Sequence, residues 1–249
     1  MTRQWEADSV SGPETAAVVR ARSWWVRTLL ATALLGTGTA AMFRLAPGGL
    51  GDAAPIEVTD GASVSVYRWA LDSIPGAPDW TAVELAGEAI LILLVLLLGW
   101  VCWSGVRRSV WPSAVAAGLT LVGTLAAYLC SEAVKLVVDQ QRPCRAVPGV
   151  PVMSHCPEIG DWSFPSNHAT IAGALAIGLV LARPRLAALA LPLAVLAALS
   201  RVVGGVHYPH DVLAGLLLGA TLCAAVVIVL TPPVVRLVAR RRPPPGGPA

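Results

Sequence analysis

Charged residues are scarce in this chain of 249 residues. Asp, Glu, Lys and Arg make up 13% of it, about half of the roughly 25% found in soluble domains. Lysine is almost absent, because Lys135 stands alone beside seventeen arginines. A hydrophobic content of 55% excludes an intrinsically disordered chain. A formal net charge of +3 provides no broad basic face, which argues against nucleic-acid binding. The composition favours an integral membrane protein.

Long runs without charge predict where the chain crosses a bilayer. About 20 apolar residues span the hydrocarbon core as a helix. The six expected spans cover residues 28–43, 81–106, 109–131, 164–182, 186–206 and 212–235. We therefore expect an all-α, polytopic bundle of six transmembrane helices over residues 23–231, between tails at 1–22 and 232–249. Five spans would follow if the first were a cleaved signal, but no convincing cleavage site follows it.

The basic residues predict the orientation of this bundle. With the N-terminus in the cytoplasm, twelve basic residues lie inside and six outside, as the positive-inside rule requires. This predicts a plasma-membrane protein whose termini are both cytoplasmic. In the first outer loop, residues 64–74 carry Val66, Trp69, Ala70 and Ile74 at roughly helical spacing. We expect a short helix on the outer interface there, with a packed lid as the simpler interpretation.

Three outer segments carry a dense set of polar residues. Lys135 and Arg142 are almost two helical turns apart, so they could share one face at the end of the third span. Pro165-Ser166-Asn167-His168 opens the fourth span, where unpaired backbone N–H groups form an anion site. The third segment places Arg201, His207 and Asp211 around the break between the last two spans, where Gly204, Gly205 and Pro209 lie.

These residue types describe a phosphate site. Lys135, Arg142 and Arg201 around a helix N-terminus suit a dianion and its more highly charged transition state. A histidine beside an aspartate, such as His207 beside Asp211, can be held in one tautomer as a nucleophile or base. A second histidine, His168, is then available as general acid. A zinc site is weakly supported, because no cysteine accompanies the histidines of the third segment.

The three segments together read K-x6-R-P, P-S-N-H and S-R-x5-H-x3-D. This order resembles the signature of the type 2 phosphatidic acid phosphatase (PAP2) superfamily, whose members are membrane lipid phosphate phosphatases and relatives of vanadium haloperoxidases. The resemblance implies a metal-independent hydrolase of the PAP2 type that needs no cofactor. It implies that His207 attacks phosphorus to form a phosphohistidine, that Asp211 orients His207, and that His168 acts as general acid and base. The implied phosphate ligands are Lys135, Arg142, Ser166, Arg201 and the backbone N–H groups of Asn167 and His168.

Several positions keep a second interpretation. Asn167 replaces the glycine usual in the family; asparagine tolerates a positive φ, and its amide could add a donor. Lys135 could pair with Glu132 or Asp139, and Ser166 could serve only as an N-cap. We expect Tyr208 and His210 to make local contacts and His155 to be a loop residue. Glu84 and Glu88 are expected at the outer edge of the second span.

Two of the five cysteines lie in the outer loop between the third and fourth spans. That compartment permits disulfides, so we expect Cys144 to pair with Cys156. Closing this loop would contribute about 2–4 kcal/mol. The bridge would restrain the segment that follows Arg142.

The substrate is expected to be amphiphilic, with its headgroup at the bundle's outer mouth and its tail in lipid. Undecaprenyl diphosphate is the substrate that the resemblance favours. Phosphatidic acid, phosphatidylglycerol phosphate and another prenyl phosphate are alternatives, as is phosphotransfer to an alcohol. A non-enzymatic transporter is the competing class, although transporters usually show inverted repeats. The sequence leaves the oligomeric state open.

Overall fold

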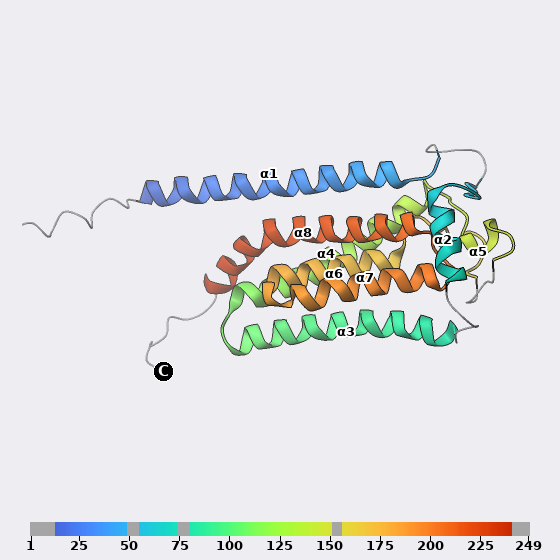
Figure 1. The fold of residues 1–249 in the computed structure, drawn as a ribbon. Coiled ribbons are helices and arrows are strands. Elements are labelled where there is room, and N and C mark those ends of the chain that lie inside the picture. Colours follow the sequence, from blue (N-terminus) through green and yellow to red (C-terminus); the bar gives the residue numbers. More distant parts are fainter. Residues whose placement is uncertain (1–12, 49–54, 74–79, 151–155, 241–249) are drawn as a thin grey trace, which may run out of the picture.

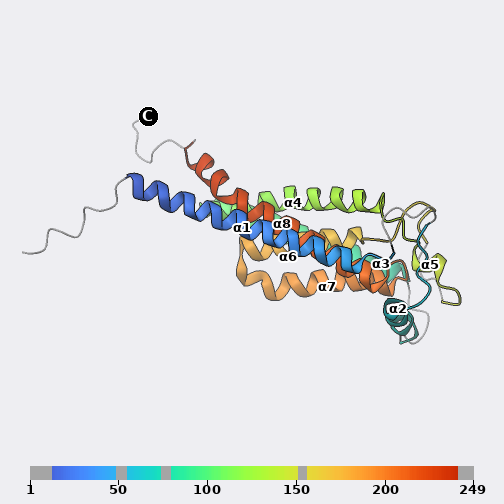
Figure 2. The same cartoon turned by 90° about the horizontal axis from the view of Figure 1, so that it is seen from above.

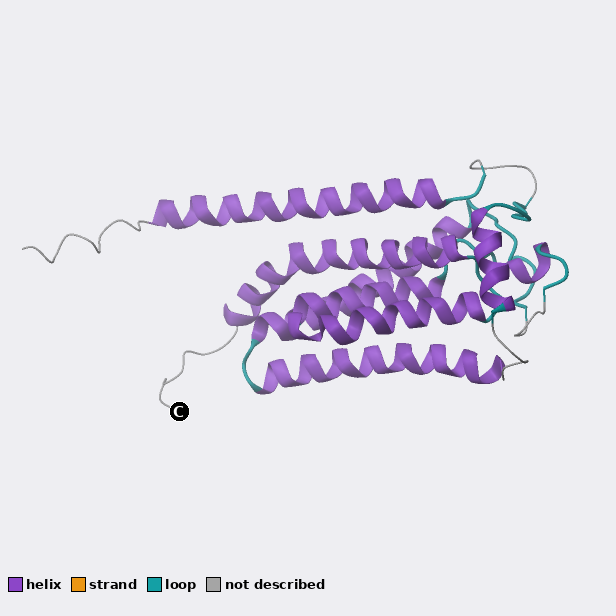
Figure 3. Ribbon diagram, in the orientation of Figure 1, coloured by secondary structure: helices purple, strands orange, loops and turns teal. Residues whose placement is uncertain are grey.

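The computed structural model describes residues 13–48, 55–73, 80–150 and 156–240. Within these ranges the chain is helical, apart from loops and an isolated bridge between Ile56 and Gln140 (Figure 3). The elements are α1 (Pro13–Leu45), α2 (Ala62–Asp72), α3 (Trp80–Arg107), α4 (Trp111–Lys135), α5 (Pro143–Ala146), α6 (Asn167–Ala182), η1 (Pro184–Leu186), α7 (Ala187–Val203) and α8 (Pro209–Arg240). The all-α expectation is confirmed for the described chain.

Each expected span coincides with a helix. Five segments are long and apolar enough to cross a membrane: Trp24–Leu45, Thr81–Arg107, Trp111–Lys135, Pro184–Val203 and Pro209–Arg240. The sixth, α6, is apolar but has only 16 residues, or about 24 Å at 1.5 Å per residue. The chain is thus a multi-pass membrane protein, while the count of six spans is not confirmed. The expected tail boundaries fall inside α1 and α8, because these helices extend beyond residues 23 and 231.

Helix α6 is the centre of the bundle and contacts α3, α4, α7 and α8, while α1 lies along α8 (Figures 1 and 2). Glycines let the backbones of α6 and α8 approach closely, as small residues do between membrane helices. A Cβ at Gly219 would lie 1.9 Å from the carbonyl oxygen of Thr170, and one at Gly215 would lie 2.5 Å from that of Ser166. This close packing fixes the start of α6 against the start of α8.

The polar segments meet at one end of the bundle, where α4 and α7 finish and α6 and α8 begin. Helices α2 and α5 lie at this same end, which we call the site end (Figure 1). Helix α7 stops at Val203, and Gly205 takes the left-handed backbone (φ 77°) that suits glycine after a helix. Pro209 then starts α8, since its missing N–H costs nothing in a first turn. The expected break between α7 and α8 is confirmed.

The short helix expected in the first outer loop is present as α2, and Ile74 of the expected apolar spacing lies outside the described residues. The buried residues are Val64, Tyr67 and Leu71, which follow the i, i+3, i+7 spacing of one helix face. Val66 is 48% exposed and Trp69 is 69% exposed. Helix α2 packs its buried face on α7 and α8. It therefore covers part of the site end.

Candidate active site

His207 and Asp211 form a fixed pair at the start of α8. His207 Nδ1 lies 3.5 Å from Asp211 Oδ2, one helical turn away. The Asp211 side chain is fully buried, and its Oδ2 accepts hydrogen bonds from the Tyr208 backbone N–H (2.8 Å) and from the Ser163 hydroxyl. Ser163 Oγ also lies 3.5 Å from His207 Nδ1. These contacts direct one ring nitrogen towards the carboxylate and leave Nε2 for chemistry.

The Nε2 atom of His207 faces a cation. Arg142 Nη1 lies 3.2 Å from it and also donates to the Val206 carbonyl oxygen at 3.1 Å. The pKa of His207 is lowered to about 3, chiefly by burial and also by Arg142 and Arg201, while Asp211 opposes the shift. The ring is thus neutral at pH 7, with Nδ1–H towards Asp211 and a lone pair on Nε2. That is the state a histidine nucleophile needs.

Lys135 and Arg142 come together through Asp161. Arg142 donates from Nε to the Asp161 backbone oxygen and from Nη2 to Asp161 Oδ1, both at 2.8 Å. Lys135 Nζ lies 3.5 Å from the same Oδ1 and 3.2 Å from Glu132 Oε1. The expected shared helix face is wrong, because α4 ends at Lys135 and Arg142 lies beyond it as the N-cap of α5. The pairing with Glu132, considered as an alternative interpretation of Lys135, is present.

Two buried donors beside this cluster have no partner in the described chain: Ser166 Oγ and Arg201 Nε. Ser166 occupies the N-cap position of α6, yet its hydroxyl makes no capping bond. Its backbone N–H donates to the Asp211 carbonyl oxygen at 3.1 Å, which links the starts of α6 and α8. Buried donors normally find acceptors. This pair is available to an anion at the N-terminus of α6.

Asn167 and His168 follow Ser166 in the first turn of α6. The Asn167 side chain donates to Glu132 Oε1 at 2.6 Å and accepts from Ser131 Oγ at 2.7 Å. The left-handed backbone considered for Asn167 is absent, since Ser109 is the only described non-glycine residue with a positive φ. His168 makes no hydrogen bond within the described chain, and Arg201, Arg142 and Lys135 act on it electrostatically. His168 therefore belongs to the same cationic cluster.

Sequence reasoning missed Asp161 and Ser163, which contact the predicted residues. Both precede the P-S-N-H segment by a few positions, but neither has a spacing that points to the site. Burial raises the pKa of Asp161, but Arg142 and Lys135 outweigh burial and hold it below its ordinary value. The acid is therefore ionised at neutral pH.

Neighbouring polar residues support the site from α2 and α3. His210 Nε2 lies 3.1 Å from Asp211 Oδ1, and its Nδ1 lies 2.7 Å from Ser63 Oγ. The His210 ring stacks on Tyr208, so the expected local contacts are present. The side chains of Glu84 and Glu88 interact electrostatically with Arg201. His155 lies outside the described residues.

The expected disulfide is present between Cys144 and Cys156, with 6.1 Å between their Cα atoms. It joins α5 to the segment that leads to Asp161. Arg145 adds hydrogen bonds from α5 to the Pro157 and Glu158 carbonyl oxygens. The loop that carries Asp161 is therefore anchored to the helix that Arg142 caps.

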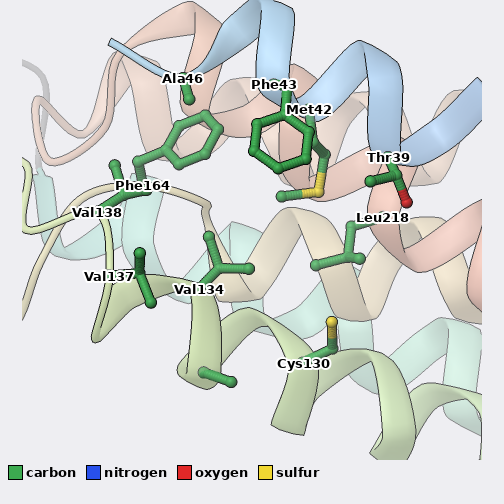
Figure 4. A pocket seen from close by; sticks show the side chains of 11 residues that line it. Thr39, Met42, Phe43, Ala46, Cys130, Val134, Val137, Val138, Phe164 and Leu218 are labelled. Carbon is green, nitrogen blue, oxygen red and sulfur yellow. The ribbon is translucent and has the colours of Figure 1, made fainter. Parts of the chain in front are cut away.

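An apolar cavity of about 340 Å³ lies beside the site end, between α1, α4 and α8. Figure 4 shows side chains from these helices around it, with Phe164 at its wall. Phe164 lies in the segment between Ser163 and Ser166, and its ring centroid is 6.0 Å from that of His210. Phe164 thus lines the cavity and also lies beside His210, which contacts Asp211. Its lining residues are Thr39, Met42, Phe43, Ala46, Cys130, Ala133, Val134, Val137, Val138, Phe164 and Leu218.

The fold and the site define a helical membrane protein with a buried histidine–aspartate pair beside a cluster of cationic side chains. The PAP2 superfamily profile matches residues 116–233, which contain every site residue predicted from the sequence. An undecaprenyl-diphosphatase of Sulfolobus acidocaldarius is 40% identical over 105 residues, which are 41% of this chain and 50% of that protein. A decaprenylphosphoryl-5-phosphoribose phosphatase of Mycobacterium tuberculosis is 38% identical over 134 residues, or 53% of this chain and 67% of that protein. The chain belongs to the PAP2 superfamily, and the resemblance seen in its motifs is confirmed.

Among solved structures, the crystal structure of Aquifex aeolicus LpxE aligns with a TM-score of 0.47 and 22% identity. The alignment covers 69% of this chain and 98% of that one. By contrast, the match to the Sulfolobus protein spans only half of that relative's length.

Proposed function

We propose that this protein hydrolyses the terminal phosphate or diphosphate of a membrane lipid through a phosphohistidine on His207. One observation carries the proposal. His207 is held by Asp211 through Nδ1 and directs Nε2 at Arg142. Beside them lie the donors Ser166 Oγ and Arg201 Nε, which have no partner among the described residues. The proposed nucleophile thus lies next to the proposed phosphate ligands in a buried part of the protein.

In the first step the phosphate enters between Arg142 and His207. Its oxygens are held by Ser166 Oγ and by the cations Lys135, Arg142 and Arg201, with the first N–H groups of α6 aimed at the same point. The Nε2 lone pair forms the N–P bond while the bond from phosphorus to the leaving oxygen breaks. His168 gives its proton to that oxygen. The ionised Asp211 stabilises the positive charge that develops on the ring.

In the second step water hydrolyses the phosphohistidine. His168 takes a proton from the water, whose oxygen bonds to phosphorus while the N–P bond breaks and returns its electron pair to Nε2. Phosphate leaves and both histidines regain their starting protonation. The three cations supply the charge stabilisation that a metal ion provides in other phosphatases, so metal independence is part of the proposal.

The apolar cavity supports a lipid substrate. Its volume of about 340 Å³ lies within the 300–1,000 Å³ typical of small-molecule pockets. Because it adjoins Phe164 at the site end, it can take hydrocarbon near a bound headgroup. The Sulfolobus and Mycobacterium relatives are both named for polyprenyl lipids. We therefore favour a prenyl diphosphate, with undecaprenyl diphosphate as the first to test.

The orientation proposed from the loop charges places the site end outside the cytoplasm. Twelve basic residues then lie on the cytoplasmic side and six on the other, in agreement with the positive-inside rule. A site on that face would act on lipid headgroups in the outer leaflet of the plasma membrane.

Release of inorganic phosphate by the purified protein tests the function. Undecaprenyl diphosphate, phosphatidic acid and phosphatidylglycerol phosphate are offered separately, each with and without EDTA. We expect the diphosphate to be hydrolysed fastest, and His207→Ala to lower kcat by at least about 10³-fold. Rapid quenching with radiolabelled substrate should trap a phosphorylated protein in the wild type and none in His207→Ala. Full turnover by His207→Ala, or activity lost in EDTA and restored by a metal ion, would contradict the mechanism.

A further inference from the structure

Asp161 forms ion pairs with Lys135 and Arg142, two of the three cations that bind the phosphate in the proposed function. We infer that Asp161 is an intramolecular competitor for the phosphate site: its carboxylate neutralises Lys135 and Arg142 when the site is empty, yields them to an incoming phosphate, and takes them back as phosphate leaves. This inference rests on the proposed phosphate site. It assigns an affinity-determining role to a residue outside the three motifs.

The contacts identify the carboxylate as the exchangeable partner. Lys135 and Arg142 are buried, and Arg142 is also held by the Val206 carbonyl oxygen and by His207. The side chain of Asp161 is 47% exposed. Its carboxylate can rotate into water while its backbone oxygen keeps the 2.8 Å bond to Arg142 Nε. A phosphate can thus replace the carboxylate without moving the loop.

The position of Arg142 couples this exchange to the nucleophile. Its Nη2 is engaged by Asp161 Oδ1 and its Nη1 lies 3.2 Å from His207 Nε2. Each guanidinium branch thus has a partner in the empty site, the carboxylate on Nη2 and the nucleophile on Nη1. A phosphate that binds the guanidinium through two oxygens competes with both partners. Where it takes the N–H of Nη1, it frees the Nε2 lone pair.

The other carboxylate on Lys135 does not fit this role. Glu132 Oε1 accepts a 2.6 Å hydrogen bond from Asn167, so it is tied to α6 as well as to Lys135. Its pairing can persist while phosphate is bound. Within the described part of the chain, the ion pairs of Asp161 are those with Lys135 and Arg142. Among the described acids, it is the one placed to alternate with a ligand.

Glu158 provides a matched control. It lies three positions before Asp161 in the same loop, is exposed, and its carboxylate contacts neither cation. Asp161→Asn and Glu158→Gln each remove one negative charge and nearly preserve shape. Only the first removes a competitor from the site, so a general effect of loop charge would appear in both variants.

Binding of inorganic phosphate to the purified full chain tests the inference, measured as thermal stabilisation over a phosphate titration. We expect Asp161→Asn to bind phosphate roughly three- to tenfold more tightly than wild type, the range for a half-exposed ion pair. Glu158→Gln should match wild type. If Asp161 only aligned the cations, its loss would weaken binding, so the sign of the change decides.

The inference would be overturned if Asp161→Asn bound phosphate as wild type does or more weakly. It would also be overturned if Glu158→Gln showed an equal gain, or if wild type bound no phosphate. Asp161→Ala serves as a second variant with the same expected sign, and unfolding without phosphate verifies that each variant is folded. Because the readout is binding, it is independent of turnover. Phosphate binding without lipid hydrolysis would refute the proposed function and leave the competitor role standing.

Discussion

Adding one methyl group at Gly215 should damage the site without touching a site side chain. Gly215 lies one turn after Asp211 on α8. A Cβ there would lie 2.5 Å from the Ser166 carbonyl oxygen and 3.1 Å from the Thr170 backbone nitrogen. Both atoms belong to the backbone of α6 and cannot rotate away. Since ordinary contact begins near 3.4 Å, Gly215→Ala requires the starts of the two helices to separate by roughly 1 Å.

That displacement acts on the link between the donors of α6 and the histidine pair. Ser166 N–H donates to the Asp211 carbonyl oxygen at 3.1 Å, so separation moves the phosphate donors away from the nucleophile. A misplacement of about 1 Å costs about 10²-fold in rate, and overpacking costs about 1–3 kcal/mol of stability. We expect kcat for phosphate release to fall about 10²-fold while the protein stays folded.

Gly118→Ala is the matched control, because a Cβ at this α4 position meets nothing within 4 Å. It should change kcat by less than about twofold, as expected for a surface substitution. Steady-state kinetics and thermal unfolding in the same detergent compare the two variants. Wild-type kcat in Gly215→Ala would refute the reasoning that α6–α8 packing sets the site geometry.

Two further predictions concern the histidine pair. Ser163→Ala removes a hydroxyl that donates to Asp211 Oδ2. It should lower kcat about tenfold with KM unchanged. An unchanged kcat would mean that the Tyr208 N–H alone fixes the carboxylate. Burial holds the pKa of His207 at about 3, below its ordinary value of 6.5. The unfolded chain therefore binds the proton first, and stability should fall as pH drops from about 6.5 towards 3, by up to about 1 kcal/mol per pH unit. Thermal unfolding of wild type and His207→Gln at pH 7, 5 and 4 measures this difference, and equal pH slopes would contradict it.

Local patterns in the sequence predicted the positions of the long helices. Runs of apolar residues identified the six expected spans, because a chain in a bilayer must satisfy its backbone hydrogen bonds within the helix. Gly205 and Pro209 marked the break between α7 and α8. The four-residue spacing of His207 and Asp211 placed them one helical turn apart, a distance that local geometry determines.

Other features could not be predicted, because the local pattern is ambiguous. Helix α2 was predicted in the right place, but two apolar stripes run along it, and only packing against α7 and α8 selects Val64 and Tyr67 over Val66 and Trp69 for burial. The two cations of the first motif were expected on one helix. The helix ends at Lys135. Further along, residues 140–141 pair with Ile56 and do not continue the helix.

The sequence by itself determined the class of this protein, the residue types of its site and their order, because those depend on composition and on short spacings. Only the tertiary structure decided which side chains contact one another in the site. Asp161 reaches Arg142 across 19 positions and Ser163 reaches Asp211 across 48. No periodicity connects such pairs, since they meet through the close packing of α6 on α8 and the anchoring of a loop by a disulfide. Partners far apart in sequence are set by the shape of the whole bundle.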